Sequence, residues 1–247
     1  MNKKLAVVLL LVGLLATVGF AAQNANDNSG DPAYQSGWVT GTNGGTGFGA
    51  WTLSPIGSSG SYIGATGLPG GNHFGLFSGD GSGNAFFATR SFAGGALTAG
   101  QTFSIDLGHT TISGAGGDIG LSLLDNGGAV FTLKAVQGGA NWLLNDGAMD
   151  FSSGATDADN TAFTFRFTYN GGNSYSYTIG SGSGTNFTAN DNISNITGFR
   201  LFSSQQGANQ NAGFDNIAVV PEPSILVLLA GPALLGGWFF LIRRRTL

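Results

Sequence analysis

The sequence predicts an all-β protein, with a single jelly-roll-like β-sandwich between an N-terminal signal peptide and a C-terminal transmembrane helix. Apolar and polar residues alternate with a period of two in several stretches, which is the pattern of strands with one buried face. Gly, Asn and Asp separate these stretches, and no segment between the two ends sustains a helical period of 3.6. Many short strands divided by such turns are typical of sandwiches and jelly rolls.

The N-terminus has the three parts of a secretory signal peptide. A positive start that includes Lys3 is followed by an uncharged apolar stretch over residues 5–18, and small side chains come next. Cleavage after Ala21 fits best, because cleavage after Ala22 would place the bulky Phe20 three residues before the cut. We therefore expect export and processing by signal peptidase, with residues 1–21 removed. An uncleaved N-terminal anchor is the alternative.

The segment that follows, residues 22–32, is rich in Ser, Asn and Gly and is expected to form a disordered leader. Glycine is abundant throughout, with 44 in the chain, and such a composition also occurs in disordered proteins. Disordered proteins, however, lack aromatic and β-branched residues, whereas the 19 phenylalanines here recur in alternating runs. We therefore expect residues 33–220 to form one glycine-rich β-sandwich ectodomain.

Two predicted hairpins carry the clearest strands. Aromatic residues alternate with polar ones over residues 163–169 and again over 175–179, across a Gly/Asn turn at 170–173. Aliphatic and aromatic residues alternate in the same way over 119–123 and 131–133, on either side of a second Gly-rich turn. Further strands are expected at residues 103–107 and 199–201.

Two passages resemble known β-sandwich modules. Between His73 and Thr111, a Gly-rich turn, an aromatic strand at residues 85–87 and a strand at 99–105 look like the first half of a carbohydrate-binding-module jelly roll. Residues 214–219 resemble the last strand of such modules and of concanavalin-like lectin domains. This resemblance implies a jelly-roll fold and leaves the ligand open.

The C-terminal end combines a short motif, an apolar stretch and a basic cluster. Residues 225–242 carry no charge, and a helix of that length spans about 27 Å, which is enough to cross the hydrocarbon core of a membrane. The arginines that follow would stay cytoplasmic and stop transfer, which places the ectodomain outside the inner membrane. The motif is Pro221, Glu222, Pro223 and Ser224, and the basic cluster is Arg243, Arg244 and Arg245.

This unit, over residues 221–247, resembles the PEP-CTERM sorting domain of exported bacterial proteins. The prolines keep the motif extended, as a protease cleft requires. The resemblance implies a substrate of exosortase, a membrane-embedded cysteine peptidase that cuts near the motif and releases the protein or transfers it to the surface. It also implies a Gram-negative bacterium that makes exopolysaccharide. A permanent single-pass anchor is the plain alternative.

Composition excludes several classes of function. Between the two ends, four basic residues stand against twelve aspartates, and such an acidic surface repels nucleic acid and anionic lipid headgroups. The absence of cysteine excludes disulfides, thiolate metal sites and cysteine nucleophiles. Glu222 is the only glutamate, so a glycoside hydrolase would have to use paired aspartates. His73 and His109 are the only histidines, and we expect them in surface or capping roles.

Aspartates are the candidate metal ligands. Asp215 alternates with two aliphatic residues of its strand, so strict pleating would place its carboxylate on their buried face, where it needs a cation or several hydrogen-bond donors. In the modules that this strand resembles, the matching aspartate often helps to hold a structural calcium ion, here with oxygens near Asp80. Asp157 and Asp159 form a second oxygen-rich cluster. The alternatives are a purely hydrogen-bonded Asp215 and ordinary solvated turns.

The expected protein is therefore an exported, non-catalytic surface or extracellular-matrix protein that associates with exopolysaccharide. Signal peptidase and exosortase would process it, with a transient anchor in the inner membrane. A lectin-like module with a defined sugar site is one alternative, favoured if aromatic side chains are exposed on one sheet. The aromatic candidates are Trp38, Trp51, Trp142 and Tyr62, which could equally form the core. A secreted glycan hydrolase with paired aspartates in a cleft is the other alternative.

Overall fold

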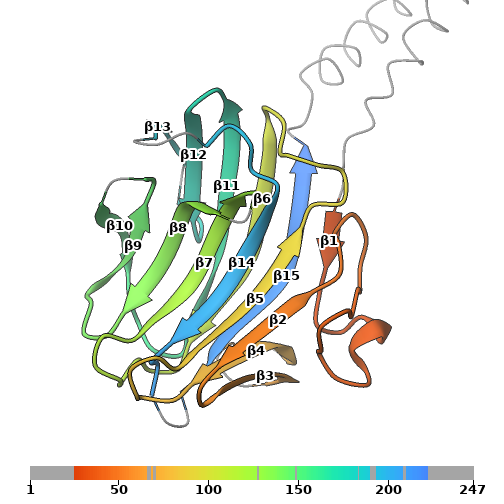
Figure 1. Cartoon of the computed structure of the whole chain (residues 1–247). Coiled ribbons are helices and arrows are strands. Elements are labelled where there is room, and N and C mark those ends of the chain that lie inside the picture. Colours follow the sequence, from red (N-terminus) through yellow and green to blue (C-terminus); the bar gives the residue numbers. More distant parts are fainter. Residues whose placement is uncertain are drawn as a thin grey trace, which may run out of the picture.

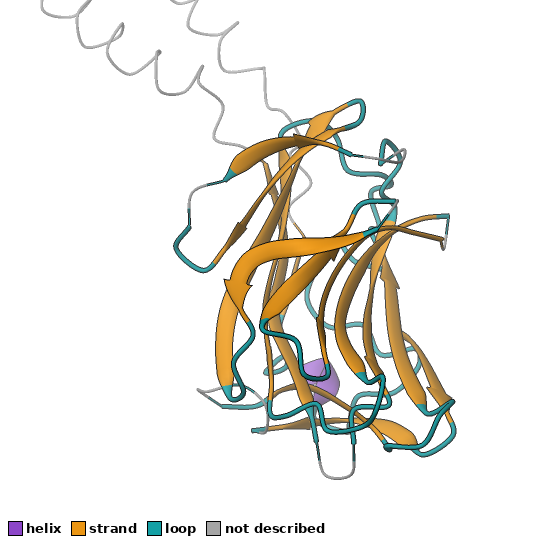
Figure 2. Ribbon diagram, turned by 90° about the vertical axis from the view of Figure 1, so that its left-hand side faces the viewer, coloured by secondary structure: helices purple, strands orange, loops and turns teal. Residues whose placement is uncertain are grey.

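The computed structural model describes residues 25–65, 68, 71–126, 128–147, 149–182, 184–189, 193–207 and 210–221. These residues form fifteen strands in two antiparallel sheets, and Figures 1 and 2 show the strands in two layers. The prediction of an all-β sandwich is confirmed. The expected signal peptide and the sorting unit after Pro221 lie outside the described residues. Within the described part of the chain, no helix is long and apolar enough to cross a membrane.

The larger sheet, here called sheet 1, has eight strands in the order β13-β12-β11-β6-β15-β4-β3, and β1 also pairs with β15. The smaller, sheet 2, has seven strands in the order β10-β9-β8-β7-β14-β5-β2. Sheet 1 consists of β1 (Ala25–Asp27), β3 (Ser59–Gly64), β4 (His73–Ser78), β6 (Gln101–His109), β11 (Thr161–Gly171), β12 (Ser174–Ile179), β13 (Thr185–Thr188) and β15 (Ala212–Pro221). Sheet 2 consists of β2 (Thr52–Ile56), β5 (Ala85–Ser91), β7 (Asp118–Asp125), β8 (Gly128–Val136), β9 (Asn141–Asn145), β10 (Asp150–Thr156) and β14 (Gly198–Ser204).

Both predicted hairpins are confirmed. Strands β11 and β12 pair with Phe167 opposite Tyr177, and β7 and β8 pair with Leu121 opposite Leu133. The alternating apolar residues point into the space between the sheets, where Phe167, Leu121 and Leu133 are fully buried. The period of two therefore identified both the strands and their buried faces.

Aromatic side chains fill much of the core. Trp38 and Trp51 meet edge to face at 5.0 Å between ring centroids, and Trp51 also contacts Phe199 at 5.6 Å. Trp142 packs edge to face on Phe163 at 4.9 Å. All three tryptophans are at most 4% exposed, so they hold the sheets together and cannot stack on a sugar.

The expectation of a disordered leader over residues 22–32 is wrong for residues 25–32. Strand β1 pairs antiparallel with β15, with Ala25 opposite Val219, and a 3₁₀ turn at Pro32–Tyr34 follows. Asp31 caps this turn by accepting a hydrogen bond from the Ala33 amide at 2.9 Å. The polar composition that suggested disorder instead supplies caps and a buried carboxylate.

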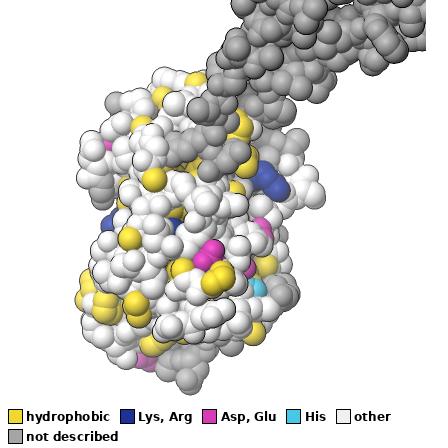
Figure 3. Space-filling view, turned by 90° about the vertical axis from the view of Figure 1, so that its right-hand side faces the viewer, with side chains coloured by type: hydrophobic (Ala, Val, Ile, Leu, Met, Phe, Trp, Pro, Cys, Tyr) yellow, Lys and Arg dark blue, Asp and Glu magenta, His cyan; other side chains and the backbone are white. Residues whose placement is uncertain are grey.

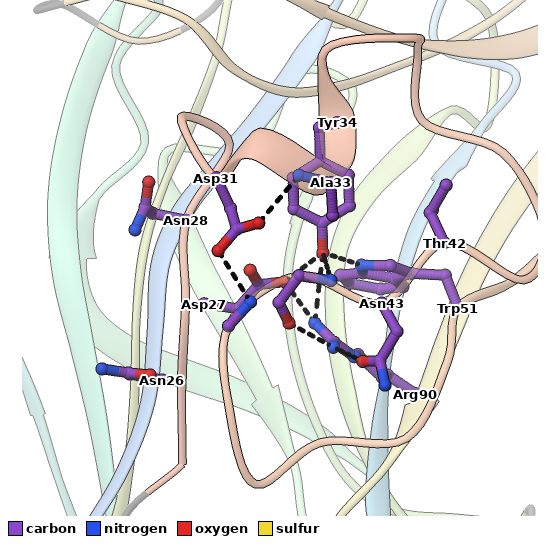
Figure 4. Close-up of polar contacts among 12 residues, drawn as sticks. Asn26, Asp27, Asn28, Asp31, Ala33, Tyr34, Thr42, Asn43, Trp51 and Arg90 are labelled. Atoms are coloured by element: carbon purple, nitrogen blue, oxygen red, sulfur yellow. Dashed lines mark hydrogen bonds and ion pairs between the residues drawn. The ribbon is translucent and has the colours of Figure 1, made fainter.

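That buried carboxylate belongs to Asp27, which forms an ion pair with Arg90 of β5 inside the sandwich (Figure 4). Neither side chain has any exposed surface. The Tyr34 hydroxyl donates to the Asp27 carboxylate at 2.5 Å and accepts from the Trp51 indole at 3.0 Å. The Arg90 guanidinium also donates to the Gly44 carbonyl at 2.8 Å, so the network ties the N-terminal segment to β5, the strand next to the β2 edge of sheet 2.

Burial dominates the acid–base properties of this network. It raises the pKa of Asp27 above its usual range in spite of the opposing hydrogen bond from Tyr34 and the charge of Arg90. Burial, together with the hydrogen bond to Asp27, raises the pKa of Tyr34 to about 12. The ion pair is thus a specific connection whose charges have lost most of their hydration.

The raised pKa of Asp27 predicts a pH effect on stability. The folded state binds this proton more tightly than the unfolded chain, so the Asp27 contribution to the unfolding free energy falls as the pH rises from 3.8 through the raised value. We expect Asp27→Asn to remove this fall. The melting temperature of the wild type should therefore fall relative to that of Asp27→Asn as the pH rises from about 3 to 7. A difference between the two melting temperatures that stays constant with pH would contradict the prediction.

The two ends of the described chain lie side by side. Ala25 begins β1 opposite Val219, two residues before β15 ends at Pro221, and Figure 1 shows these strand ends at the same corner of the sandwich. Pro221 is still paired, opposite Gln101 of β6. The folded domain therefore extends to the first residue of the Pro-Glu-Pro motif.

Candidate functional site

A β-bulge in β15 determines where Asp215 points. The pairing of β15 with β6 shifts register between Asp215 and Ala218, and Asn216 adopts a left-handed backbone conformation with φ of 49°. Ile217 and Val219 remain buried, whereas Asp215 and Asn216 both face outward from sheet 1. The prediction that Asp215 shares the buried face of Ile217 and Val219 is therefore wrong, because the bulge interrupts strict alternation.

Asp215 lies in a hollow of about 250 Å³ on the outer face of sheet 1. Its carboxylate is 16% exposed, and Oδ1 accepts a hydrogen bond from the Ser29 amide at 2.8 Å. Strands β4, β6, β11 and β15 each contribute at least one side chain to the lining. The lining residues are Leu68, His73, Asp106, Ala162, Phe163, Thr164, Asp215 and Asn216.

His73 supplies a nearly buried imidazole to this hollow, with 5% of its side chain exposed. Its Nε2 bonds to the Leu68 carbonyl at 2.8 Å, and because a carbonyl can only accept, Nε2 carries the proton. Its Nδ1 lies 3.9 Å from Oδ2 of Asp215 and has no hydrogen-bond partner among the described residues. The imidazole thus presents one ring nitrogen to the carboxylate in the hollow.

Asp106 is the second carboxylate of the hollow and lies directly opposite Asp215 on the neighbouring strand β6. The Thr164 hydroxyl donates to its Oδ1 at 2.5 Å, and the Asn216 amide donates to its Oδ2 at 2.8 Å. Both oxygens are therefore held in place by protein donors. Residues directly opposite on antiparallel strands have Cβ atoms about 4.5–5.5 Å apart, so the two carboxylates are close neighbours.

The other predicted ligand, Asp80, does not join this site. Asp80 follows the end of β4 at Ser78, whereas Asp215 lies beside His73 at the start of that strand. Among the described residues, no three or more His or acidic side chains are arranged to hold a metal ion. The geometry around Asp215 matches the hydrogen-bonded alternative, since its Oδ1 accepts the Ser29 amide. Calcium binding remains an untested prediction.

The structure brings the predicted pair Asp157 and Asp159 together with His109. The Nε2 of this buried imidazole lies 2.6 Å from Oδ1 of Asp157, and its Nδ1 lies 3.7 Å from Oδ1 of Asp159. The Thr111 hydroxyl donates to the other oxygen of Asp159 at 2.9 Å. These residues line a second hollow of about 450 Å³. His109 thus ties the loop before β11 to the end of β6, which agrees with its expected capping role.

Two aromatic rings extend the outer face of sheet 1 beyond the first hollow. The Tyr62 ring of β3 lies over Gly75 of β4, where a Cβ atom would come within 2.2 Å of it. The Phe77 ring lies in the same way over Gly60, and the two ring centroids are 6.5 Å apart. Phe77 is 39% exposed. Of the four aromatic candidates in the sequence, only Tyr62 therefore faces outward.

Comparison with known proteins identifies the architecture. No protein-family model matches the chain, and no curated protein sequence matches it. Among solved structures, an endo-acting O-glycanase of the human gut microbiota matches with 10% identity and a TM-score of 0.54, covering 79% of this chain and 98% of that one. The cellulose induced protein Cip1 matches with 15% identity and a TM-score of 0.53, covering 79% and 96%. The chain thus shares its two-sheet antiparallel sandwich with these structures.

A galectin from Caenorhabditis elegans also matches, with 12% identity and a TM-score of 0.38, covering 50% of this chain and 85% of the galectin. At such identities the likeness to solved structures concerns the fold alone. What the sandwich does therefore has to be argued from its own side chains.

Proposed function

We propose that the chain is an exported, non-catalytic surface or extracellular-matrix protein that binds exopolysaccharide through the outer face of sheet 1. The observation that carries this proposal is the hollow around Asp215. Carboxylate and amide groups converge there, and sugar-binding sites use a few fixed polar groups of this kind to orient hydroxyls. The glycan-related proteins that share the fold agree with this proposal.

The surface around the hollow suits a hydroxyl-rich partner. Thr102 and Thr168 bond to each other at 2.7 Å across β6 and β11, on the same face as Asp106 and Thr164. Figure 3, which views the molecule from the right-hand side of Figure 1, shows few charged side chains on the described surface of that edge. Polysaccharide hydroxyls can exchange hydrogen bonds with such a surface without displacing many ions.

The experiment compares Asp215, which lies beside the start of β4, with Asp80, which follows the end of that strand. We expect Asp215→Asn to weaken binding of the cells' purified exopolysaccharide, and of neutral β-glucan oligosaccharides, by about tenfold, the size of one lost charged hydrogen bond. The matched control, Asp80→Asn, should bind as the wild type does. Calorimetric titration of the exported protein measures both, and equal binding by all three proteins would refute the site.

A lectin-like module with a defined sugar site is the first alternative, and one observation favours it. Tyr62 and Phe77 lie on the same outer face as His73, along or beside strand β4. Sugar rings stack on aromatic faces in many binding sites, so these two rings could form one side of a subsite. Selective loss of a single oligosaccharide in Phe77→Ala, with other glycans unaffected, would favour this alternative.

A glycan hydrolase is the second alternative, because Asp106 and Asp215 are neighbouring carboxylates in one hollow. Retaining enzymes use carboxyl groups about 5 Å apart, one of which must donate a proton. Both oxygens of Asp106 already accept hydrogen bonds, from Thr164 and Asn216, which suits a fixed acceptor better than an acid. Release of reducing ends from a polysaccharide, abolished in Asp106→Asn, would establish hydrolysis instead of binding.

The sorting signals complete the proposal. Residues 1–21 would direct export, and residues 221–247 would hold the protein in the inner membrane until exosortase cuts near the motif. Because β1 and β15 are paired at one corner of the sandwich, both signals would be attached at the same end of the domain. The hollow, formed largely by strands β4, β6, β11 and β15, would remain accessible after processing.

A further inference from the structure

The outer face of sheet 2 carries a guanidinium that makes no ion pair among the described residues. Arg200 lies on the central strand β14, between Phe199 and Leu201, which are fully buried, so its side chain projects from the opposite face. Its guanidinium carbon lies 5.2 Å from the centroid of the Phe87 ring. Within the described residues Arg200 makes no ion pair, and its Nε is buried without a hydrogen-bond partner.

This arrangement fixes the cation and leaves its donors unused. A guanidinium stacked on an aromatic ring keeps one orientation, and its planar fork matches the two oxygens of a carboxylate. Because Nε is buried, a ligand would meet the terminal nitrogens of the guanidinium, where a carboxylate could accept two charge-assisted hydrogen bonds. The site is therefore complementary to a carboxylate group.

The strands beside Arg200 supply groups for a sugar that carries such a carboxylate. Thr132 of β8 supplies a hydroxyl two strands from Arg200, where it bonds to that of Ser122 at 2.9 Å; Ser122 itself, opposite Arg200 on β7, is only 3% exposed. Lys134 lies two residues beyond Thr132 on β8, and β8 is two strands away from β14, which is about 10 Å across the sheet. The row of hydroxyls thus continues from Arg200 toward a second cation.

Two aspartates on the same face set the charge balance. Asp150 forms an ion pair with Lys134 at 2.7 Å, so this lysine is largely neutralised and Arg200 is the free cation of the patch. Asp118 lies beside Lys134, opposite Val136 on β8; burial raises its pKa, and the charge of Lys134 opposes that rise. The chain as a whole is acidic, with a formal net charge of −4, so a polyanion would be held by Arg200 and repelled by the aspartates elsewhere.

We propose that the outer face of sheet 2 binds a carboxylate-bearing polysaccharide, with a uronic acid unit on Arg200 and the polymer crossing β7 and β8. This inference rests on the proposed function and names a class of polysaccharide and a second surface for it. Sheet 1 would then bind neutral polysaccharide hydroxyls, and sheet 2 would bind an acidic sugar unit, on two different faces of one domain.

The test uses polygalacturonate oligosaccharides and the same oligosaccharides fully methyl-esterified, which keep the sugar ring and lose the charge. We expect wild type to bind the acid at least about tenfold more tightly than the ester, and Arg200→Met to remove this preference. Arg200→Lys should retain part of it, because an ammonium is a point charge without the bidentate fork. Arg166→Met is the charge-matched control: it removes a cation from the outer face of sheet 1 and should leave the preference for the acid over the ester unchanged.

Melting curves of each variant show whether it folds, and Arg200→Lys provides a second variant if Arg200→Met does not. Equal binding of acid and ester by the wild type, or an undiminished preference in a folded Arg200→Met, overturns the proposal. If the wild type does not bind polygalacturonate but still binds neutral oligosaccharides through Asp215, only the inference on sheet 2 fails. If it binds neither, the proposed polysaccharide function fails with it.

Discussion

Replacement of Arg90 by methionine is expected to lower the unfolding free energy by about 3–5 kcal/mol, because it leaves the carboxylate of Asp27 buried without its cation. For a domain of this size, that loss corresponds to a fall of roughly 6–20 °C in melting temperature. The guanidinium also packs on Phe48 and Trp51, with its carbon 5.0 and 5.1 Å from their ring centroids. Methionine keeps part of this apolar contact, so most of the effect comes from the lost charge. Thermal and urea unfolding of residues 22–221 measure it.

Two further variants separate the ion pair from general disruption. Arg166→Met, on an exposed position of β11, should change the unfolding free energy by no more than about 0.5 kcal/mol. Combining Asp27→Leu with Arg90→Met should recover much of the stability, since removing both buried charges is often neutral. An Arg90→Met protein that melts with the wild type, or a double variant no better than the single one, would show that the pair contributes little.

The strands were predictable because their signal is local. Alternation over residues 163–169 specifies a strand and its buried face without knowledge of any partner, and the structure places β11 there. The turn at residues 170–173 joins β11 to β12 as expected, since Gly171 and Gly172 both adopt positive φ. Local pattern and turn chemistry thus defined the hairpins, which supply one side of the core.

The bulge at Asp215 was not predictable from the same pattern. The left-handed conformation of Asn216 is fixed by pairing of β15 with β4 and β1 on one side and with β6 on the other. Those partners lie far away in the sequence, and a one-residue insertion in one strand moves every following side chain relative to strict alternation. Asn is a residue that tolerates positive φ, which was the one available signal.

Residues 25–32 show why composition misleads for short segments. A polar segment of this length buries too little apolar surface to fold alone, so disorder is the natural expectation. Its order comes from β15, about 190 residues later, and from Arg90, 63 residues away from Asp27. The same limitation hid the contact of His109 with Asp157, which are 48 residues apart. Pairings at such separations become visible only in the folded chain.

Replacement of both Glu222 and Pro223 by alanine is expected to leave nearly all of the exported protein in the inner-membrane fraction. The apolar stretch over residues 225–242 and the arginines after it are unchanged, so stop-transfer should proceed as before. What is lost is the motif that the proposed sorting peptidase would recognise. Fractionation of the producing cells, with intact mass measurement of the released protein, follows the effect.

The structure suggests why cleavage there would free a complete domain. Strand β15 ends at Pro221, which is still paired opposite Gln101, so a cut beyond this residue would remove no part of the sandwich. Thr246→Ala is the matched control, because it lies outside the motif, the apolar stretch and the arginine cluster and should be released as the wild type is. The released protein should begin near Ala22 and lack residues 225–247. Normal release of the double variant, or a released protein that keeps its C-terminal tail, would leave a simple membrane anchor as the explanation of residues 225–247.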